Sequence, residues 1–142
     1  MRDGFATAAT LERDLEALLA AAPDCRLVAY CDLDTRLVLR HVAEPGVRQE
    51  LLDRLSAEAS DAFGLRAAAC AMLPPGLSPL REETEGIRLI DDRGVRLFLR
   101  ASDAPQDALI LLCASSEGAE ALRPAAARLL CGPTSPPQAG YA

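Results

Sequence analysis

Cys25 and His41 are the residues whose types could most readily do chemistry together, because a thiol beside an imidazole can act as a nucleophile with its base. The segments 26–31 and 36–42 alternate like strands and are joined by a short polar connection. Pairing of these strands would bring Cys25 close to His41 or Val42. His41 is the only histidine, and no second base or orienting acid can be identified for the pair. Strand packing explains both residues, so the sequence predicts no catalytic residue.

Two further groups of reactive side chains also have structural explanations. Asp32 and Asp34 form a carboxylate pair in the connection between the two strands, where aspartate readily caps its own backbone in a tight loop. The chain has five cysteines, Cys25, Cys31, Cys70, Cys113 and Cys131. None of them forms a C-x-x-C pair, and free buried thiols are the usual state without a secretion signal. The sequence therefore predicts neither a metal site nor a cofactor site.

All fifteen basic residues are arginines, because the chain contains no lysine. Schiff-base and pyridoxal chemistry, the lysine of a phosphate-binding loop and Ser–Lys mechanisms all require lysine. The composition therefore excludes these enzyme classes. Asparagine is absent as well. Both absences are typical of a GC-rich genome and indicate a bacterial source.

Length and charge narrow the possible partners. The chain has 142 residues, of which 50% are hydrophobic, and a net charge of −6, as expected of one globular domain. Its arginines are scattered among acids and form no basic stripe for a nucleic acid backbone. No signal peptide is recognisable, and no apolar run reaches the roughly 18 residues of a membrane-spanning helix. We expect a soluble, cytoplasmic protein that binds neither nucleic acid nor membrane.

Helical periodicity marks two segments in the first half of the chain. Thr10 is the expected N-cap of the first helix, and Pro23 ends it. A second helix is predicted from Val47. It ends either at Gly64, as a C′ glycine, or near Met72, because the alanines at 67–69 favour helix.

Strand patterns mark the stretch 86–114, around which the rest of the domain is organised. Residues 86–91 and 95–100 alternate and are joined by a short Asp/Gly turn, which predicts a β-hairpin. A polar break at 101–107 leads to 108–114, which has no polar side chain except a cysteine, as expected of a strand covered on both faces. We predict that 86–91 lies at an edge of the sheet and that 109–113 lies at its centre.

The end of the chain is predicted to carry one more helix. Ser115 or Ser116 can cap it, and Pro124 either kinks it or splits it in two. The expected organisation is a flexible N-terminus at 1–9, one domain at 10–131 and a disordered Pro/Gly-rich tail at 132–142. The element order is α-β-β-α-β-β-β-α. We therefore predict an α+β fold with a five-stranded, mainly antiparallel sheet and helices packed on its faces.

This order of elements resembles the roadblock family of dynein light chains and bacterial small-GTPase regulators. The resemblance covers about residues 10–131 and is carried by the segments 27–32, 37–39, 47–63, 86–99 and 108–130. It implies a roadblock/profilin-like fold. It also implies a non-enzymatic regulatory or scaffold protein that forms a homodimer, binds a Ras-like small GTPase and modulates its nucleotide cycle.

The resemblance also suggests which residues would make these contacts. The homodimer is expected to form through the central helix and the edge strand of the hairpin. The candidate interface residues are Leu51, Leu52, Leu55, Ala59, Ile87 and Leu89. Arg48 and Arg54 are suggested as contacts for the GTPase. The alternative function is a small-molecule-sensing or signalling adaptor domain of profilin or PAS type, which would need a cavity between the sheet and a helix.

Overall fold

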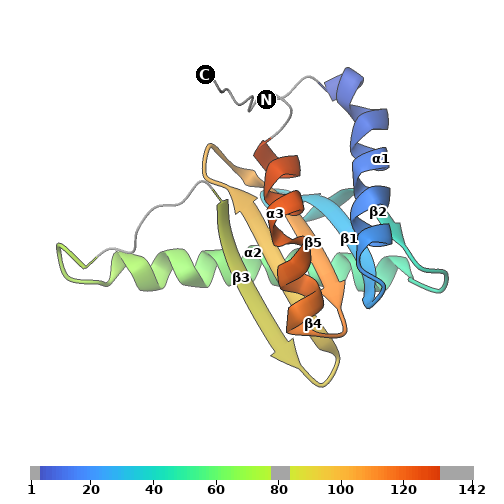
Figure 1. The fold of residues 1–142 in the computed structure, drawn as a ribbon. Helices are drawn as coiled ribbons and strands as arrows, with labels where there is room; N and C mark the ends of the chain where they lie inside the picture. Colours follow the sequence, from blue (N-terminus) through green and yellow to red (C-terminus); the bar gives the residue numbers. More distant parts are fainter. Residues whose placement is uncertain (1–3, 78–83, 132–142) are drawn as a thin grey trace.

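The fold is a five-stranded antiparallel sheet with helices on both faces (Figure 1). The computed structural model describes residues 4–77 and 84–131. Its elements are α1 (Gly4–Ala21), β1 (Cys25–Asp32), β2 (Leu37–Ala43), α2 (Gln49–Ala71), β3 (Thr84–Asp91), β4 (Gly94–Ala101), β5 (Ala104–Cys113) and α3 (Ser116–Cys131). The predicted fold class and element order are confirmed.

The strands lie in the order β2-β1-β5-β4-β3, and every neighbouring pair is antiparallel. β5 occupies the centre of the sheet, and its residues 108–113 are all buried. β3 forms one edge and β2 the other. The structure thus confirms the predicted central strand and the predicted edge strand. It also buries residues 95–99 of β4, whereas the residues of β3 are half-buried or exposed.

A tight turn joins β3 to β4. Asp91 pairs with Gly94 across the hairpin, and the Arg93 N–H donates to Asp91 Oδ1 at 2.9 Å. Gly94 has φ of 120°, and a Cβ there would lie 2.8 Å from the carbonyl oxygen of Cys113. Only glycine combines this backbone conformation with such a close approach. The Asp/Gly signal in the sequence therefore reflects a real steric demand.

Two hydrophobic clusters lie on opposite faces of the sheet. α1 and α3 cover one face, where the buried residues include Leu15, Val28, Leu97, Leu111 and Leu122. α2 covers the other face, where they include Leu27, Leu55, Phe63, Phe98 and Ile110. Each inner strand therefore contributes apolar side chains to both faces, which explains the nearly continuous hydrophobic runs in the sequence.

Several boundaries differ from the prediction. α1 begins at Gly4, so Thr10 lies inside the helix and is not its N-cap. The expected polar break after β4 is only a short turn, because β4 extends to Ala101 and β5 starts at Ala104. Strand pairing continues through this segment because the two strands form a hairpin. Their polar residues lie near its exposed end.

The three open questions about the later helices are answered by the structure. α2 continues through Gly64 to Ala71, as the longer alternative predicted. At the start of α3, the Gly118 N–H donates to Ser115 Oγ at 3.0 Å, so Ser115 is the capping side chain. α3 is one helix with Pro124 inside it, and the proline lies on its exposed side. The tail at 132–142 and residues 78–83 lie outside the described residues, and the domain limits at 10 and 131 stay predictions.

Candidate interaction surface

α2 has two halves with different surroundings. Its first half packs on the sheet, where Leu52, Leu55, Ala59 and Phe63 are buried. None of the residues 64–71 is buried. The alanines at 67–69 explain why the helix persists without a surface to pack on, since alanine has the highest helix propensity. In Figure 1, this second half extends past β3 and beyond the sheet.

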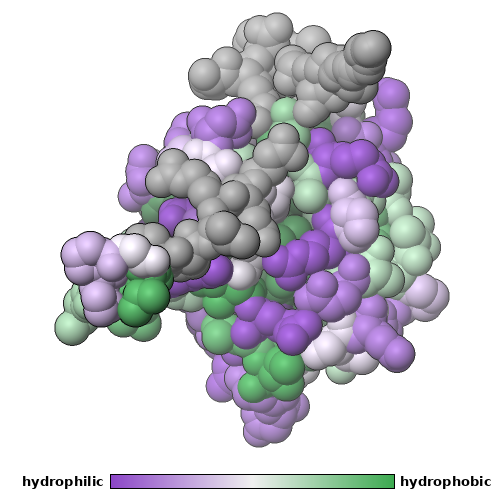
Figure 2. Space-filling view, turned by 60° about the vertical axis from the view of Figure 1, so that its left-hand side comes forward, coloured by the Kyte–Doolittle hydropathy of each residue, from purple (hydrophilic) through white to green (hydrophobic). Residues whose placement is uncertain are grey.

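Large apolar side chains are exposed on the projecting segment. Leu65 is 72% exposed and Met72 is 84% exposed. Leu73 and Leu77, in the turn that follows the helix, are also exposed. Figure 2 shows hydrophobic surface on this segment and again lower on the same face. Large apolar side chains exposed together on one segment are typical of sites where another molecule binds.

β3 lies beside this projection and has an open edge. In the described part of the chain it pairs only with β4. Ile87 and Leu89 are half-buried and pack against the α2-side cluster, whereas Ile90 is 62% exposed. An edge strand of this length can pair with a further strand unless its side chains prevent it.

Ion pairs tie the edge to the rest of the domain. Arg66 of α2 donates to the carbonyl oxygen of Gly86 at 2.7 Å. Glu85 accepts from Arg100 Nε at 2.8 Å, and the Arg100 guanidinium lies 4.4 Å from the ring centroid of Phe63. On the other face, Arg88 of β3 pairs with Glu120 of α3 at 2.8 Å.

Arg96 makes the most buried of these ionic contacts. Its guanidinium donates to Glu58 Oε1 of α2 at 2.6 Å and to Asp91 Oδ2 of β3 at 2.9 Å. The hydrogen bonds from Arg96 lower the pKa of Asp91 from 3.8 to about 2. The same contact with Asp91 raises the pKa of Arg96, which stays charged. Arg96 therefore links α2 to β3 and β4, and its positive charge offsets the negative charges of Glu58 and Asp91 at the end of β3.

The six residues suggested for the dimer interface occupy different environments. Leu52, Leu55 and Ala59 are buried against the chain's own sheet. Leu51, Ile87 and Leu89 are half-buried beside the same cluster. The sequence reasoning missed the exposed residues Leu65, Met72, Leu73 and Leu77. Leu65 and Met72 lie two helical turns apart, so the longer alternative for this helix already places them on one apolar side, which is the signal that identifies this surface.

The arginines suggested for partner contact are both exposed. Arg54 lies within α2, and Arg48 is the residue immediately before it. Arg48 makes no side-chain cap hydrogen bond at the start of the helix. Both side chains are therefore available on the first half of α2, away from the sheet.

The predicted proximity of Cys25 and His41 is wrong. His41 pairs with Ala29, and a bulge at Tyr30 and Cys31 shifts the register of β1 with β2. Cys25 instead lies opposite Cys113 and forms a disulfide with it. β1 has β5 on its other side, so the start of β1 meets the end of β5. The expectation that all five cysteines are free is therefore also wrong.

The other cysteines are outside the disulfide and lie in different surroundings. Cys31 is buried, and desolvation together with Asp32 and Asp107 raises its pKa to about 12. Such a thiol is not reactive at neutral pH. Cys70 and Cys131 are half-exposed. Within the described residues, no cluster of three or more His, Cys, Asp or Glu side chains is arranged to hold a metal ion.

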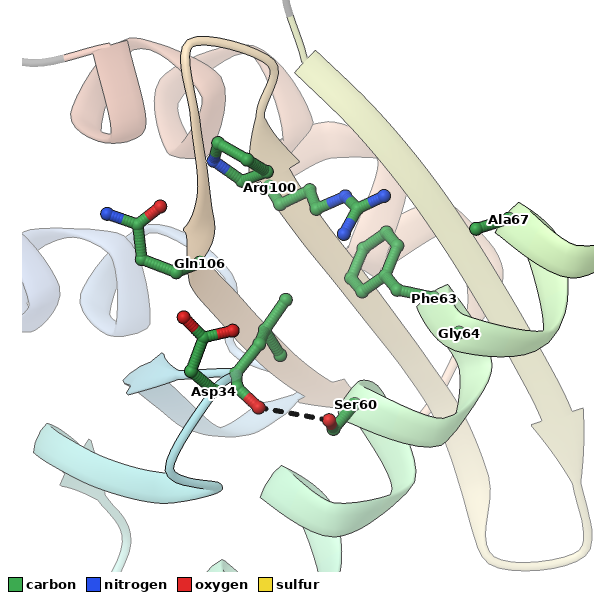
Figure 3. Close-up of a pocket in the computed structure, with 9 residues that line it drawn as sticks. Asp34, Ser60, Phe63, Gly64, Ala67, Arg100 and Gln106 are labelled. Carbon is green, nitrogen blue, oxygen red and sulfur yellow. Dashed lines mark hydrogen bonds between the residues drawn. The ribbon is translucent and has the colours of Figure 1, made fainter.

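A shallow groove of about 300 Å³ lies between α2 and the ends of the strands. Ser60, Phe63, Gly64 and Ala67 line it from the helix, and the β1–β2 turn, Arg100 and the start of β5 form the opposite wall (Figure 3). Ser60 Oγ donates to the carbonyl oxygen of Leu33 at 3.0 Å. The groove exists because α2 carries small side chains at this point.

Comparisons with solved structures identify the fold. The chain is similar to a roadblock/LC7 domain from Streptomyces avermitilis, with 18% identity and a TM-score of 0.63 over 84% of this chain and 91% of that one. It is similar to the gliding protein MglB of Thermus thermophilus, with 17% identity and a TM-score of 0.65 over 92% and 90%. A structure described as MglB with a tetrameric arrangement matches with 16% identity and a TM-score of 0.63 over 92% and 90%. No protein-family model and no curated protein matches the sequence.

Proposed function

We propose that this chain, which has the roadblock fold, is a non-enzymatic regulatory or scaffold protein that works as a homodimer and binds a Ras-like small GTPase. The fold is shared with roadblock/LC7 domains and with MglB, which is named as a gliding protein. The observation that carries the proposal is the exposed apolar half of α2 beside the open edge of β3.

The geometry of this surface suits a two-fold interface. β3 of one protomer would pair with β3 of the other and extend the sheet. The projecting end of α2 would then lie over the partner and cover Leu65 and Met72, which one protomer leaves exposed. A stable interface buries on the order of 1,600 Å² in total. One of the MglB structures is described as tetrameric, so proteins of this fold do assemble.

The GTPase partner follows from the family resemblance. His41 pairs with Ala29, and Cys25, the candidate nucleophile, is held in the disulfide with Cys113. A regulator without its own catalytic group can still modulate hydrolysis by positioning the residues of the GTPase. We assign this contact to the exposed side of α2 that carries Arg48 and Arg54.

The two parts of the proposal need separate tests. Light scattering coupled to size exclusion measures whether the protein is a dimer. Pull-down with the small GTPases of the same genome, loaded with GDP or a GTP analogue, measures partner binding, and Arg48→Glu with Arg54→Glu should reduce it. A monomer would contradict the first part. Failure to bind any of these GTPases in either nucleotide state would contradict the second.

The groove beside α2 favours a second candidate function, the binding of a small molecule. It lies between the sheet and a helix and brings Asp34, Ser60 and Gln106 to one opening. A thermal-shift screen with metabolites tests this function. A stabilising compound whose effect disappears in Ala67→Trp, which fills the groove, would support sensing over GTPase regulation.

In the described ranges, 4–77 and 84–131, no helix has the length and apolarity needed to span a membrane. We propose that the protein acts in the cytoplasm, where fractionation of cells would detect it.

A further inference from the structure

β2 is the second edge of the sheet. In the part of the chain that the structure describes, it pairs with β1 alone, so the backbone groups on its outer side face no strand. A row of such groups can bind an extended segment, which then becomes a further strand of the sheet. β2 is therefore a possible binding site that the proposed dimer leaves unused.

Two leucines are exposed along this edge. Leu37 is 55% exposed and Leu39 is 46% exposed. Leu37 lies opposite Asp32, and Leu39 is the extra residue of the bulge opposite Tyr30 and Cys31. After the bulge the ladder with β1 is regular from residue 40 to residue 43. An added strand would pair along this regular part, next to the leucines.

Basic side chains follow directly along the strand. Arg40 and His41 are exposed, and the Arg40 guanidinium donates only to the carbonyl oxygen of Leu39, at 3.1 Å, among the contacts of the described residues. Arg36, just before β2, does have an acidic partner, Asp61, at 2.6 Å. Arg40 is thus a cation without an acidic partner in a chain whose net charge is −6.

This charge selects the kind of segment that would bind. A second copy of β2 would place Arg40 near another Arg40, and like charges across a strand pair are destabilising. A segment with carboxylates would instead place opposite charges together, which favours its association over that of neutral or basic segments.

We propose that the β2 edge binds an extended acidic segment of another protein, with apolar residues at alternate positions, as a sixth strand of the sheet. The carboxylates of the segment lie beside Arg40, which pairs with Tyr30 and therefore faces the α1 side of the sheet. Its apolar side chains lie on the opposite face, beside Val38 and Ala43, because successive side chains of a strand alternate between the two faces. This site lies at the opposite edge of the sheet from β3 and does not depend on the proposed dimer.

The experiment uses the full chain labelled with ¹⁵N and two synthetic hexapeptides. One alternates glutamate and valine, and the other alternates lysine and valine. The acidic peptide is expected to shift the amide signals of residues 37–43, slow their hydrogen exchange and bind roughly ten-fold more tightly than the basic one. Absence of a response, a response centred on another element, or equal binding of the two peptides would overturn the proposal.

Two variants separate a specific site from general charge attraction. Arg40→Glu is expected to remove binding of the acidic peptide. Arg93→Glu makes the same charge change in the β3–β4 turn, where the side chain is also exposed, and should leave binding unchanged. Equal effects of the two variants, or no effect of Arg40→Glu, would refute a site at β2. Protection of the β2 amides that grows with protein concentration, without peptide, would show that a second copy occupies the edge instead.

Discussion

The two edges of the sheet differ in how their charges are balanced. Each charged residue within β3 has a partner of opposite charge: Glu85 contacts Arg66 and Arg100, Arg88 contacts Glu120, and Asp91 contacts Arg96. On β2, Arg40 has no acidic partner among the described residues. The charges on β3 are therefore paired within the protomer, whereas β2 carries a positive charge that no acid among the described residues pairs with.

This difference indicates which edge can meet a copy of itself. A two-fold axis brings identical side chains together, so a strand with balanced charges pairs with itself at a lower electrostatic cost than a basic one. The apolar projection of α2 lies beside β3 and not beside β2 (Figure 1). We therefore assign self-association to β3 and binding of a different, acidic partner to β2.

The largest expected effect comes from placing charge on the α2 projection. Leu65→Asp together with Met72→Asp should raise the dissociation constant of the proposed dimer by roughly 100-fold, since both side chains would be covered in it. The fold should persist because both residues are largely exposed in the protomer. Sedimentation equilibrium measures the dissociation constant, and circular dichroism confirms the fold.

Leu37→Asp with Leu39→Asp is the matched control on the other edge. These leucines are also exposed, so this double variant, like the one on α2, replaces two exposed apolar side chains by aspartate and makes the same change in charge. It should leave the dimer unchanged. Dissociation by this control, with no effect of the α2 variant, would reverse the assignment of the two edges.

The second-largest expected effect comes from removing Arg96, the cation that pairs with the acids beside β3. Arg96→Met should destabilise the protomer by about 2 kcal/mol, because charge-assisted hydrogen bonds to two acids are lost and methionine fills only part of the space. Glu58 and Asp91 would then add negative charge beside the β3 edge and weaken the dimer. Urea unfolding measures the first effect and sedimentation the second. Arg40→Met, on β2, should change neither the stability of the protomer nor the dissociation constant of the dimer. An equal loss of stability in this control would show that the ionic contacts of Arg96 are not the cause.

The sequence predicted the sheet well because its strands have unambiguous patterns. The run at 108–114 fits a strand covered on both faces, and the Asp/Gly turn after residue 91 has the steric reason seen at Gly94. The edge position of β3 followed from its polar alternation. These features are local, so one sequence is enough to show them.

The contacts that depend on register could not be predicted in this way. The turn between β1 and β2 pairs Asp32 with Leu37, and the bulge at Leu39 shifts the register by one more residue. His41 therefore lies opposite Ala29 and away from Cys25. The disulfide depends on β1 lying between β2 and β5, which is a pairing between strands distant in sequence. The exposed end of α2 was missed for another reason, since helix propensity alone left its end at Gly64 or at Met72.

Acid should weaken the link between β3 and Arg96. The pKa of Asp91 falls from 3.8 to about 2 on folding, so the stabilisation by its carboxylate is fully present above pH 3.8 and is lost as the pH falls toward 2 and below. Urea unfolding of the wild type and of Asp91→Asn should differ near neutral pH, and the difference should shrink across this window. A difference that stays constant down to pH 2 would show that the pair does not form.

The smallest effect comes from Gly64, where α2 leaves the sheet. It is helical, and a Cβ there would meet nothing within 4 Å, so the packing of the protomer does not require glycine. Gly64→Ala should therefore stabilise the protomer by about 1 kcal/mol, the difference in helix propensity, as measured by urea unfolding at low protein concentration. The effect of Gly64→Ala on dimer association would show whether Gly64 lies in the interface. Unchanged association would place Gly64 outside the interface, whereas weaker association despite a more stable protomer would show that a second chain packs against the helix backbone at this residue.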